Sequence, residues 1–106
     1  MRMEFVFDEA AVLRRGYTMQ TVHDAMKAEF AKWNLVCVSD GDVLAFEGTG
    51  HKNDYSSMLN MMRIYSRAEW FMEIASGWVF RTRDTKEWED VLIQARDRFA
   101  RRKASA

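Results

Sequence analysis

The stretch of sequence that decides the fold covers residues 53–75 and reads NDYSSMLNMMRIYSRAEWFMEIA. At helical spacing its apolar side chains fall on two stripes instead of one. The first stripe consists of Tyr55, Met58, Met62 and Tyr65, and the second of Met61, Ile64, Ala68, Phe71 and Ala75. A helix that is apolar on two sides has to be covered twice, by its own domain and by something else. The pattern therefore predicts that a second subunit or another protein covers one stripe.

The same stretch carries a signal for a break. Ser66 is followed three residues later by Glu69, which matches the capping box of a helix N-terminus. We therefore interpret residues 53–75 as one long helix or as two helices that meet near Ser66. A rival interpretation makes residues 70–75 a strand that forms a hairpin with residues 78–82. With a break, each half can turn its apolar stripe to the core of one subunit, so that a second subunit is no longer required.

Outside this stretch the chain alternates between strand and helix signals. Alternating apolar residues predict strands, Asp40-Gly41 is typical of a hairpin turn, and Thr18 is typical of a helix start. The expected strands are residues 3–7, 35–38, 43–47 and 78–82. The further expected helices are a short turn at residues 8–15, a helix that starts at Met19, and a C-terminal helix from Lys86 to about Arg102 that Asp84 or Thr85 caps.

The order of these elements is strand, helix, strand, strand, helix, strand, helix. It predicts a single α+β domain over residues 1–106, a ferredoxin-like β-α-β-β-α-β sandwich with an additional C-terminal helix. Residues 103–106 are expected to form a frayed tail. A three-layer or other α+β arrangement stays open. The helices would cover one sheet face, and the large side chains of Trp78, Phe80 and Trp88 favour a second cover for the other face.

Composition and charge narrow the classes of function. The chain has 106 residues, and its 16 basic and 16 acidic side chains cancel, so that the overall field favours neither nucleic acid nor polycations. The single cysteine, Cys37, excludes an intramolecular disulfide, and no N-terminal apolar region resembles a secretion signal. No apolar run approaches the roughly 20 residues that span a bilayer. We therefore expect a cytoplasmic protein without a membrane partner.

One loop has the ingredients of an anion-binding site. It combines flexible glycines, a histidine and a lysine at the N-terminus of an expected helix, where free N–H groups favour an anion. Its residues are Gly48, Gly50, His51 and Lys52. The loop lacks the spacing of a Walker loop and of a dinucleotide-binding loop, and Asp54 would repel an anion. A plain strand-to-helix turn is therefore the preferred interpretation.

Catalysis and metal binding have little support in the sequence. His23 and Cys37 have no second ligand at suitable spacing and are interpreted as a boundary histidine and a buried thiol. Several carboxylates at strand ends and loops are of the type that binds Mg²⁺, but turn and cap roles explain them without a metal. These are Asp8, Asp40, Asp42, Glu47 and Asp54. We predict no catalytic residue, no metal ligand set and no cofactor, and an enzyme is the less favoured class.

The basic end of the C-terminal helix is a candidate nucleic-acid surface. Arg98, Arg101 and Arg102 would contact phosphates, with Trp78 and Phe80 of the last strand as stacking surfaces. However, the aromatic and glycine pattern of RNA-binding sheets is missing, and arginines at the end of a helix are usually solvated partners of its dipole. Nucleic-acid association is therefore an alternative and not the preferred function.

The preferred function is a small cytoplasmic protein-protein interaction module that forms homodimers. Its expected interface is the second apolar surface, which consists of Met61, Ile64, Trp70, Phe71 and Trp78. Methionine suits such a surface because its flexible side chain can repack against different partners. A nucleic-acid-associated protein is the first alternative, and a metal- or phosphate-dependent small enzyme around His51 and the acidic loops is the second.

Overall fold

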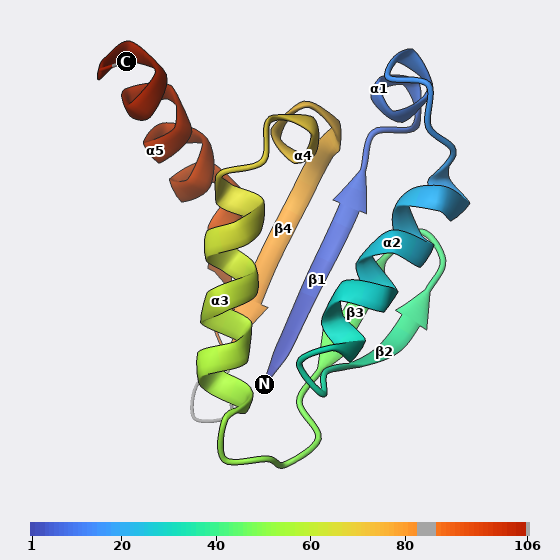
Figure 1. Ribbon diagram of the computed structural model, residues 1–106, viewed down its shortest axis with the longest axis vertical. Helices are drawn as coiled ribbons and strands as arrows, with labels where there is room; N and C mark the ends of the chain where they lie inside the picture. Colours follow the sequence, from blue (N-terminus) through green and yellow to red (C-terminus); the bar gives the residue numbers. More distant parts are fainter. Residues whose placement is uncertain (83–86, 106) are drawn as a thin grey trace.

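The computed structural model describes residues 1–82 and 87–105, and it forms an antiparallel sheet with helices packed on it (Figure 1). Along the chain the elements are β1 (Arg2–Phe7), α1 (Glu9–Arg14), α2 (Met19–Ala31), β2 (Val36–Asp40), β3 (Leu44–Glu47), α3 (Asp54–Ser66), α4 (Glu69–Ile74), β4 (Ala75–Arg81), β5 (Glu89–Asp90) and α5 (Val91–Ser105). The five strands have the order β2-β3-β1-β4-β5, and every pairing is antiparallel. The expected mixture of helices with an antiparallel sheet is confirmed.

Strand β5 makes the sheet differ from the expected one. It pairs with the outer side of β4, where Asp90 lies opposite Val79 and Glu89 lies opposite Phe80. The sequence predicts four strands, and the fifth strand extends the sheet beyond that order. The specific ferredoxin-like order is therefore not confirmed.

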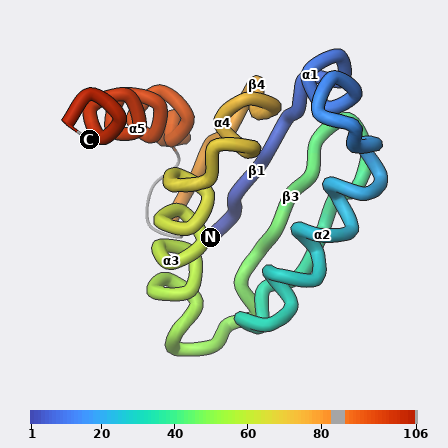
Figure 2. The backbone as a smooth tube through the Cα atoms, turned by 45° about the horizontal axis from the view of Figure 1, so that its top comes forward, coloured from blue at the N-terminus to red at the C-terminus, as the bar shows by residue number. Residues whose placement is uncertain are grey.

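Alternate residues of β1 build the core. Met3, Phe5 and Phe7 are buried under the helices, as the alternating sequence predicts. Phe5 occupies the centre, because its ring stacks at 5.7 Å on Trp78 and meets Phe71 edge-on at 5.8 Å, measured between ring centroids. Helices α2 and α3 lie over the same face of the sheet (Figure 2), and their buried apolar side chains belong to this one cluster.

The opposite face of the sheet combines an ion-pair row with half-exposed valines. The Arg2 guanidinium lies 2.7 Å from the carboxylate of Glu4 and 2.8 Å from that of Glu47 on the neighbouring strand. Val6 and Val36 share this face by register and are exposed. This face therefore contacts solvent through both charged and apolar groups.

The stretch over residues 53–75 is two helices, as one of the two helical interpretations predicts. Helix α3 ends at Ser66 and α4 begins at Glu69, so the rival interpretation of a strand at residues 70–75 is wrong. The expected capping box is also wrong. Ala68 is the N-cap of α4 and offers no side-chain hydrogen bond, while the Ser66 hydroxyl donates back to the carbonyl of Met62 at 2.5 Å. The hydroxyl is thus used by the helix that precedes the break.

The C-terminal helix starts later than the sequence predicts. Residues 89 and 90 are strand, and α5 begins at Val91, where the carboxylate of Asp90 accepts a hydrogen bond from the N–H of Ile93 at 3.2 Å. Trp88 therefore precedes β5 and is half-exposed, whereas the expected helix from Lys86 to about Arg102 would include it. The expected caps and helix start at residues 84–86 lie outside the described residues. Residues 103–105, expected in a frayed tail, are helical.

Candidate functional site

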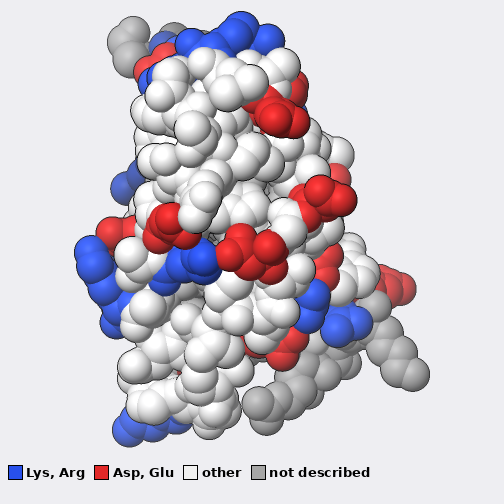
Figure 3. Space-filling view, turned by 90° about the vertical axis from the view of Figure 1, so that its right-hand side faces the viewer, with Lys and Arg blue, Asp and Glu red and all other residues white. Residues whose placement is uncertain are grey.

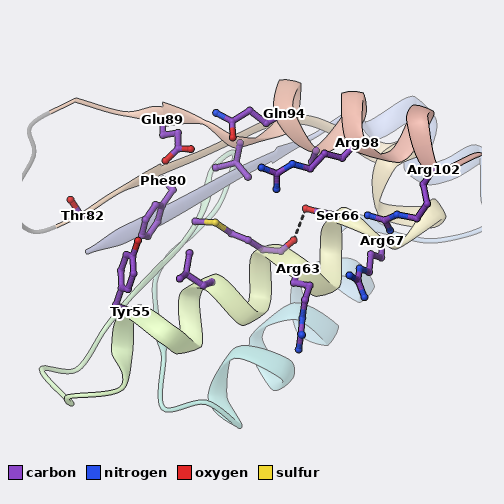
Figure 4. A pocket seen from close by; sticks show the side chains of 14 residues that line it. Tyr55, Arg63, Ser66, Arg67, Phe80, Thr82, Glu89, Gln94, Arg98 and Arg102 are labelled. Atoms are coloured by element: carbon purple, nitrogen blue, oxygen red, sulfur yellow. Dashed lines mark hydrogen bonds between the residues drawn. The ribbon is translucent and has the colours of Figure 1, made fainter.

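A groove between α3 and α5 is the candidate functional site. Its cavity has a volume of about 520 Å³, within the range of about 300–1,000 Å³ that is typical of ligand sites. Its lining combines apolar and polar side chains, and we call the apolar ones the floor and the others the rim (Figure 4). The floor residues are Leu59, Met62, Phe80, Val91 and Ala95, and the rim residues are Tyr55, Arg63, Ser66, Arg67, Thr82, Glu89, Gln94, Arg98 and Arg102. We refer to these residues together as the α3–α5 groove.

The two ends of the α3–α5 groove differ in charge. The lining at one end includes Arg63 of α3, its C-cap residue Arg67, and Arg98 and Arg102 of α5, and we call these four residues the arginine end. In Figure 4 the Arg63 side chain is directed away from α5, so that its guanidinium lies on the side of Asn60. The other end is formed by Tyr55, Thr82 and Glu89 (Figure 4). The sequence places the arginines in this way because each pair is spaced i,i+4, so that both members lie on one face of their helix.

The arginine end lacks internal counter-charges. Among residues 1–82 and 87–105, no carboxylate forms an ion pair with any of the four arginines, and Arg63 donates at 2.8 Å to the neutral side chain of Asn60. The dipoles of α3 and α5 contribute about half a negative charge at each helix C-terminus. Two such termini offset only part of the positive charge of these arginines. The arginine end therefore carries positive charge that no ion pair of the described residues neutralises.

The other basic side chains of α5 are already engaged. Arg101 pairs with Asp97 at 3.1 Å, and the Lys103 ammonium lies 3.3 Å from the carboxylate of Glu69. Arg96 donates to two main-chain carbonyls near the junction of α4 and β4. The basic residues of α5 thus form two groups. Arg96, Arg101 and Lys103 have partners within the chain, whereas Arg98 and Arg102 line the groove.

This separation changes the predicted nucleic-acid surface. Arg98 and Arg102 line the α3–α5 groove, whereas Arg101 is paired with Asp97 and is not among the lining residues. The predicted stacking surfaces are in the core, since Trp78 is 1% and Phe80 is 3% exposed. The sequence interpretation also missed Arg63 and Arg67. Their i,i+4 spacing was visible, but nothing in the sequence showed that α5 lies opposite.

The predicted interface residues are mostly internal. Met61, Phe71 and Trp78 are buried within the chain itself, so their side chains leave no surface for a partner. The reason is the break after α3, which brings α4 back over the same core. Ile64 remains 42% exposed, and Trp70 packs partly against the core and lines a cavity of about 170 Å³ beside α2. The second apolar stripe is therefore covered largely from within.

The predicted anion-binding loop is built around a carboxylate of the chain. Asp54 is only 6% exposed, and its Oδ2 accepts a hydrogen bond from the N–H of Gly50 at 2.8 Å. A Cβ at Gly48 would overlap this carboxylate, so glycine is required there. His51 is exposed, and its Nδ1 accepts from the N–H of Asn53 at 3.1 Å. Asp54 thus occupies a donor that a bound anion would need, and Lys52 is exposed to solvent.

His23 lies in an ion-pair cluster that ties α2 to β2. It is buried, its Nδ1 lies 2.8 Å from Oδ1 of Asp40, and the Lys27 ammonium lies 2.6 Å from Oδ2 of the same carboxylate. The hydrogen bond from Lys27, followed by that from His23, lowers the pKa of Asp40. No group of three or more metal-ligating side chains converges in the described part of the chain. The cluster is therefore interpreted as a structural contact.

Other findings outside the groove do not point to a site. Figure 3 views the side of α2 and β2 and shows acidic and basic side chains beside each other, without a large patch of one sign. Within the described residues, none of the helices combines the length and apolar character needed to cross a membrane.

Comparisons with models of protein families, with curated proteins and with solved structures found no match. The α3–α5 groove is therefore the best-supported candidate site.

Proposed function

We propose that the protein is an interaction module that binds an acidic segment of a partner protein in the α3–α5 groove. The observation that carries this proposal is the arginine end, with four guanidinium groups that no carboxylate of the described residues neutralises. Guanidinium groups bind carboxylates through paired hydrogen bonds, and arginine is enriched in protein interfaces. Acidic side chains of a partner would supply the missing charges.

The floor of the groove supports a peptide as the ligand. Met62 and Leu59 from α3 face Val91 and Ala95 from α5, which gives an apolar surface between the two charged ends. Apolar side chains of a bound segment would be removed from water there, at about 25 cal/mol for each Å² buried. The Met62 side chain can adjust its shape to the bound residues. The segment is therefore expected to be amphipathic, with its acidic residues at one end.

Glu89 gives the bound segment a direction. It lies at the end of the groove opposite the arginine end, beside Phe80 (Figure 4). An acidic residue of the partner near Glu89 would be repelled, while one near the arginines would be attracted. The acidic end of the segment therefore lies towards the C-termini of α3 and α5.

Nucleic acid fits the groove less well. A single strand carries its phosphates along its whole length and stacks its bases on exposed aromatic rings. Among the described residues that line the groove, the arginines lie at one end and Glu89 lies at the other, while Phe80 is only 3% exposed. These features favour a protein segment of mixed character over a nucleic-acid strand.

The groove also assigns a role to the C-terminal elements β5 and α5. We propose that β2-β3-β1-β4, with the connections through α2 and α3, form a ferredoxin-like unit to which β5 and α5 are added. The antiparallel pairings of β1 with β3 and β4 and of β2 with β3 support this interpretation. On this view α5 is the added element that supplies one wall of the groove.

The test uses a fluorescein-labelled peptide with leucines in its middle and glutamates at one end. Fluorescence anisotropy should show saturable binding that weakens as salt screens the exposed charges. The double variant Arg67→Gln/Arg102→Gln should weaken binding about tenfold, which corresponds to about 1.4 kcal/mol. The single variant Arg102→Gln is compared with Arg101→Gln, its matched control, which removes one charge from the adjacent position of the same helix, outside the groove. Equal affinities of the two variants, or no binding, would contradict the proposal.

Self-association is a second candidate, supported by the uncovered face of the sheet. Val6 and Val36 are exposed there, and Val79 lies on the same face by register. A dimer would bury these side chains. Light scattering coupled to size exclusion should then give twice the 12.5 kDa mass of the chain, and Val36→Lys should restore the monomer. A monomer at all concentrations would remove this candidate.

A further inference from the structure

We propose that the arginine end binds a phosphate monoester, so that the acidic partner segment docks when a serine or threonine in it is phosphorylated. This inference rests on the proposed function of the α3–α5 groove and specifies its ligand. The observation behind it is that several arginines without an ion pair lie at one end of the groove. Arg67 at the end of α3 and Arg98 and Arg102 of α5 are directed at the same end of one cavity, which Arg63 also lines.

The charge of the ligand is the first argument. A carboxylate carries one negative charge, whereas a phosphate monoester carries about 1.5 to 2 at pH 7 on a single side chain. Three arginines, Arg67, Arg98 and Arg102, are directed at this end, and the two helix dipoles offset about one of their charges. One phosphorylated residue balances the remaining charge of about two. Carboxylates alone would need about two residues held against one another in the same small space.

The type of cation is the second argument. All four unpaired groups are guanidinium groups, and the nearby ammonium of Lys103 is directed to Glu69 instead. A guanidinium presents a planar fork of N–H donors that matches two phosphate oxygens at once, which an ammonium does not. Three oxygens of a phosphate monoester can accept hydrogen bonds from several forks simultaneously. A carboxylate offers only two oxygens.

The arrangement of the four side chains is the third argument. In Figure 4 the Arg98 side chain reaches into the cavity, while Arg67 and Arg102 come from different helices to the same end of the groove. Arg67 is the C-cap residue of α3, and Arg102 belongs to the last turn of α5. A group bound between them would therefore contact both walls of the groove. A phosphate fits this position because its oxygens point in several directions.

The groove also limits where the phosphorylated residue can lie. Glu89 at the far end repels a second strongly charged group, so one phosphate at the arginine end is expected for each bound segment. The residues next to it would be apolar and would lie over Met62 and Ala95. The recognised sequence is therefore a phosphorylated residue followed or preceded by apolar residues, without a second phosphate.

The experiment compares three versions of the leucine-containing peptide that differ at one position near its acidic end: phosphoserine, serine and glutamate. Isothermal titration should give an affinity for the phosphoserine peptide that is at least about tenfold higher than for the glutamate peptide. The preference should decrease below about pH 6, where the phosphate gains a proton. Arg67→Gln/Arg102→Gln should abolish the preference, and Arg101→Gln should keep it. Circular dichroism verifies that each variant is folded.

The outcomes separate this inference from the proposed function. Equal binding of the phosphoserine and glutamate peptides would overturn the phosphate inference and leave the acidic-segment proposal intact. Absence of binding to all three peptides would overturn both. A preference that survives in Arg67→Gln/Arg102→Gln would place the phosphate elsewhere and overturn the assignment. Tighter binding of a single-stranded oligonucleotide or of vesicles with anionic lipids, each used as a probe, would also overturn it in favour of another phosphate source.

Discussion

Nδ1 of His23 lies 2.8 Å from Oδ1 of Asp40, and this contact fastens the middle of α2 to the end of β2. The second oxygen of Asp40 binds the Lys27 ammonium at 2.6 Å. The histidine is buried against Phe7, at 5.9 Å between ring centroids, while the carboxylate is more exposed. One side chain of β2 thus joins a buried ring and an exposed cation of the same helix.

The contacts of Asp40 make stability depend on pH. The hydrogen bond from Lys27 lowers the pKa of Asp40 in the folded state and raises the pKa of Lys27. The carboxylate therefore stabilises the fold above its ordinary pKa of 3.8, and this contribution is lost as the pH falls through the lower folded value. The ammonium contribution is complete below 10.5 and is lost as the pH rises through its raised folded value.

We therefore expect Asp40→Asn to lower the melting temperature at neutral pH and to have little effect in strong acid. Thermal unfolding followed by circular dichroism at a series of pH values measures this difference. Asp42→Asn, in the turn that follows, is the control and should change little. A deficit of Asp40→Asn that persists unchanged in strong acid would show that the carboxylate charge is not its source.

A methyl group at Gly48 should destabilise the loop before α3. It would overlap the Asp54 carboxylate and would disturb the hydrogen bond from the N–H of Gly50. Gly48→Ala should therefore lower the free energy of unfolding by about 1–3 kcal/mol, the usual cost of disturbing a buried polar group. Gly41→Ala is the control, since nothing lies within 4 Å of a Cβ at that position. Urea denaturation compares the two variants, and equal stabilities would contradict the packing at Gly48.

Met61 and Ile64 should behave differently although both belong to the second apolar stripe of residues 53–75. Met61 is fully buried, so Met61→Ala should leave a cavity and lower the free energy of unfolding by about 2–5 kcal/mol. Ile64 is 42% exposed, and Ile64→Ala should cost less than about 1 kcal/mol. Urea denaturation measures both. A small effect of Met61→Ala would contradict the burial of this side chain and favour the surface position that the sequence interpretation gave it.

Arg96 should stabilise the junction between α4 and β4. Its guanidinium donates to the carbonyls of Met72 at 3.3 Å and Ala75 at 2.5 Å, where the helix ends and the strand begins without a loop. Arg96→Ala should lower the free energy of unfolding by about 1–2 kcal/mol. Arg101→Ala should change it by less than about 0.5 kcal/mol, because its pair with Asp97 is exposed. Similar values for both variants would mean that the two carbonyl contacts contribute little.

The break after α3 shows what the sequence can and cannot predict. The position of the break is correct, and it was inferred from the spacing of Ser66 and Glu69. The predicted cause of the break, a capping box, is wrong. The Ser66 hydroxyl can either cap the N-terminus of α4 or donate to the carbonyl of Met62, and only the packed structure shows that it does the second. Strand β5 was missed for a related reason. Glu89 and Asp90 have low strand propensity and form a strand only through pairing with β4.

The groove was only half predictable. Arg98 and Arg102 were recognised as basic residues at the end of a helix, but Arg101 between them looked the same in the sequence. Its separation from the groove depends on the rotation of α5 about its own axis. The arginines of α3 are about 30 residues away in the chain and meet those of α5 only through tertiary packing. Such a site cannot be read from the spacing within one helix.

The apolar contacts of helix α5 are concentrated at its N-terminal end, and the exposed pair of Lys103 with Glu69 is an ion pair that joins it to another element among the described residues. Its buried residues Val91, Leu92 and Ala95 all lie in its first turns, with Phe99 partly buried beyond them, and the C-terminal half stands away from the rest of the molecule (Figure 1). Main-chain amides in that half should exchange with deuterated solvent faster than those near Val91, because few contacts oppose local opening. A ligand held between the two walls would slow this exchange. The bound partner would thereby stabilise α5, which is one wall of the groove that binds it.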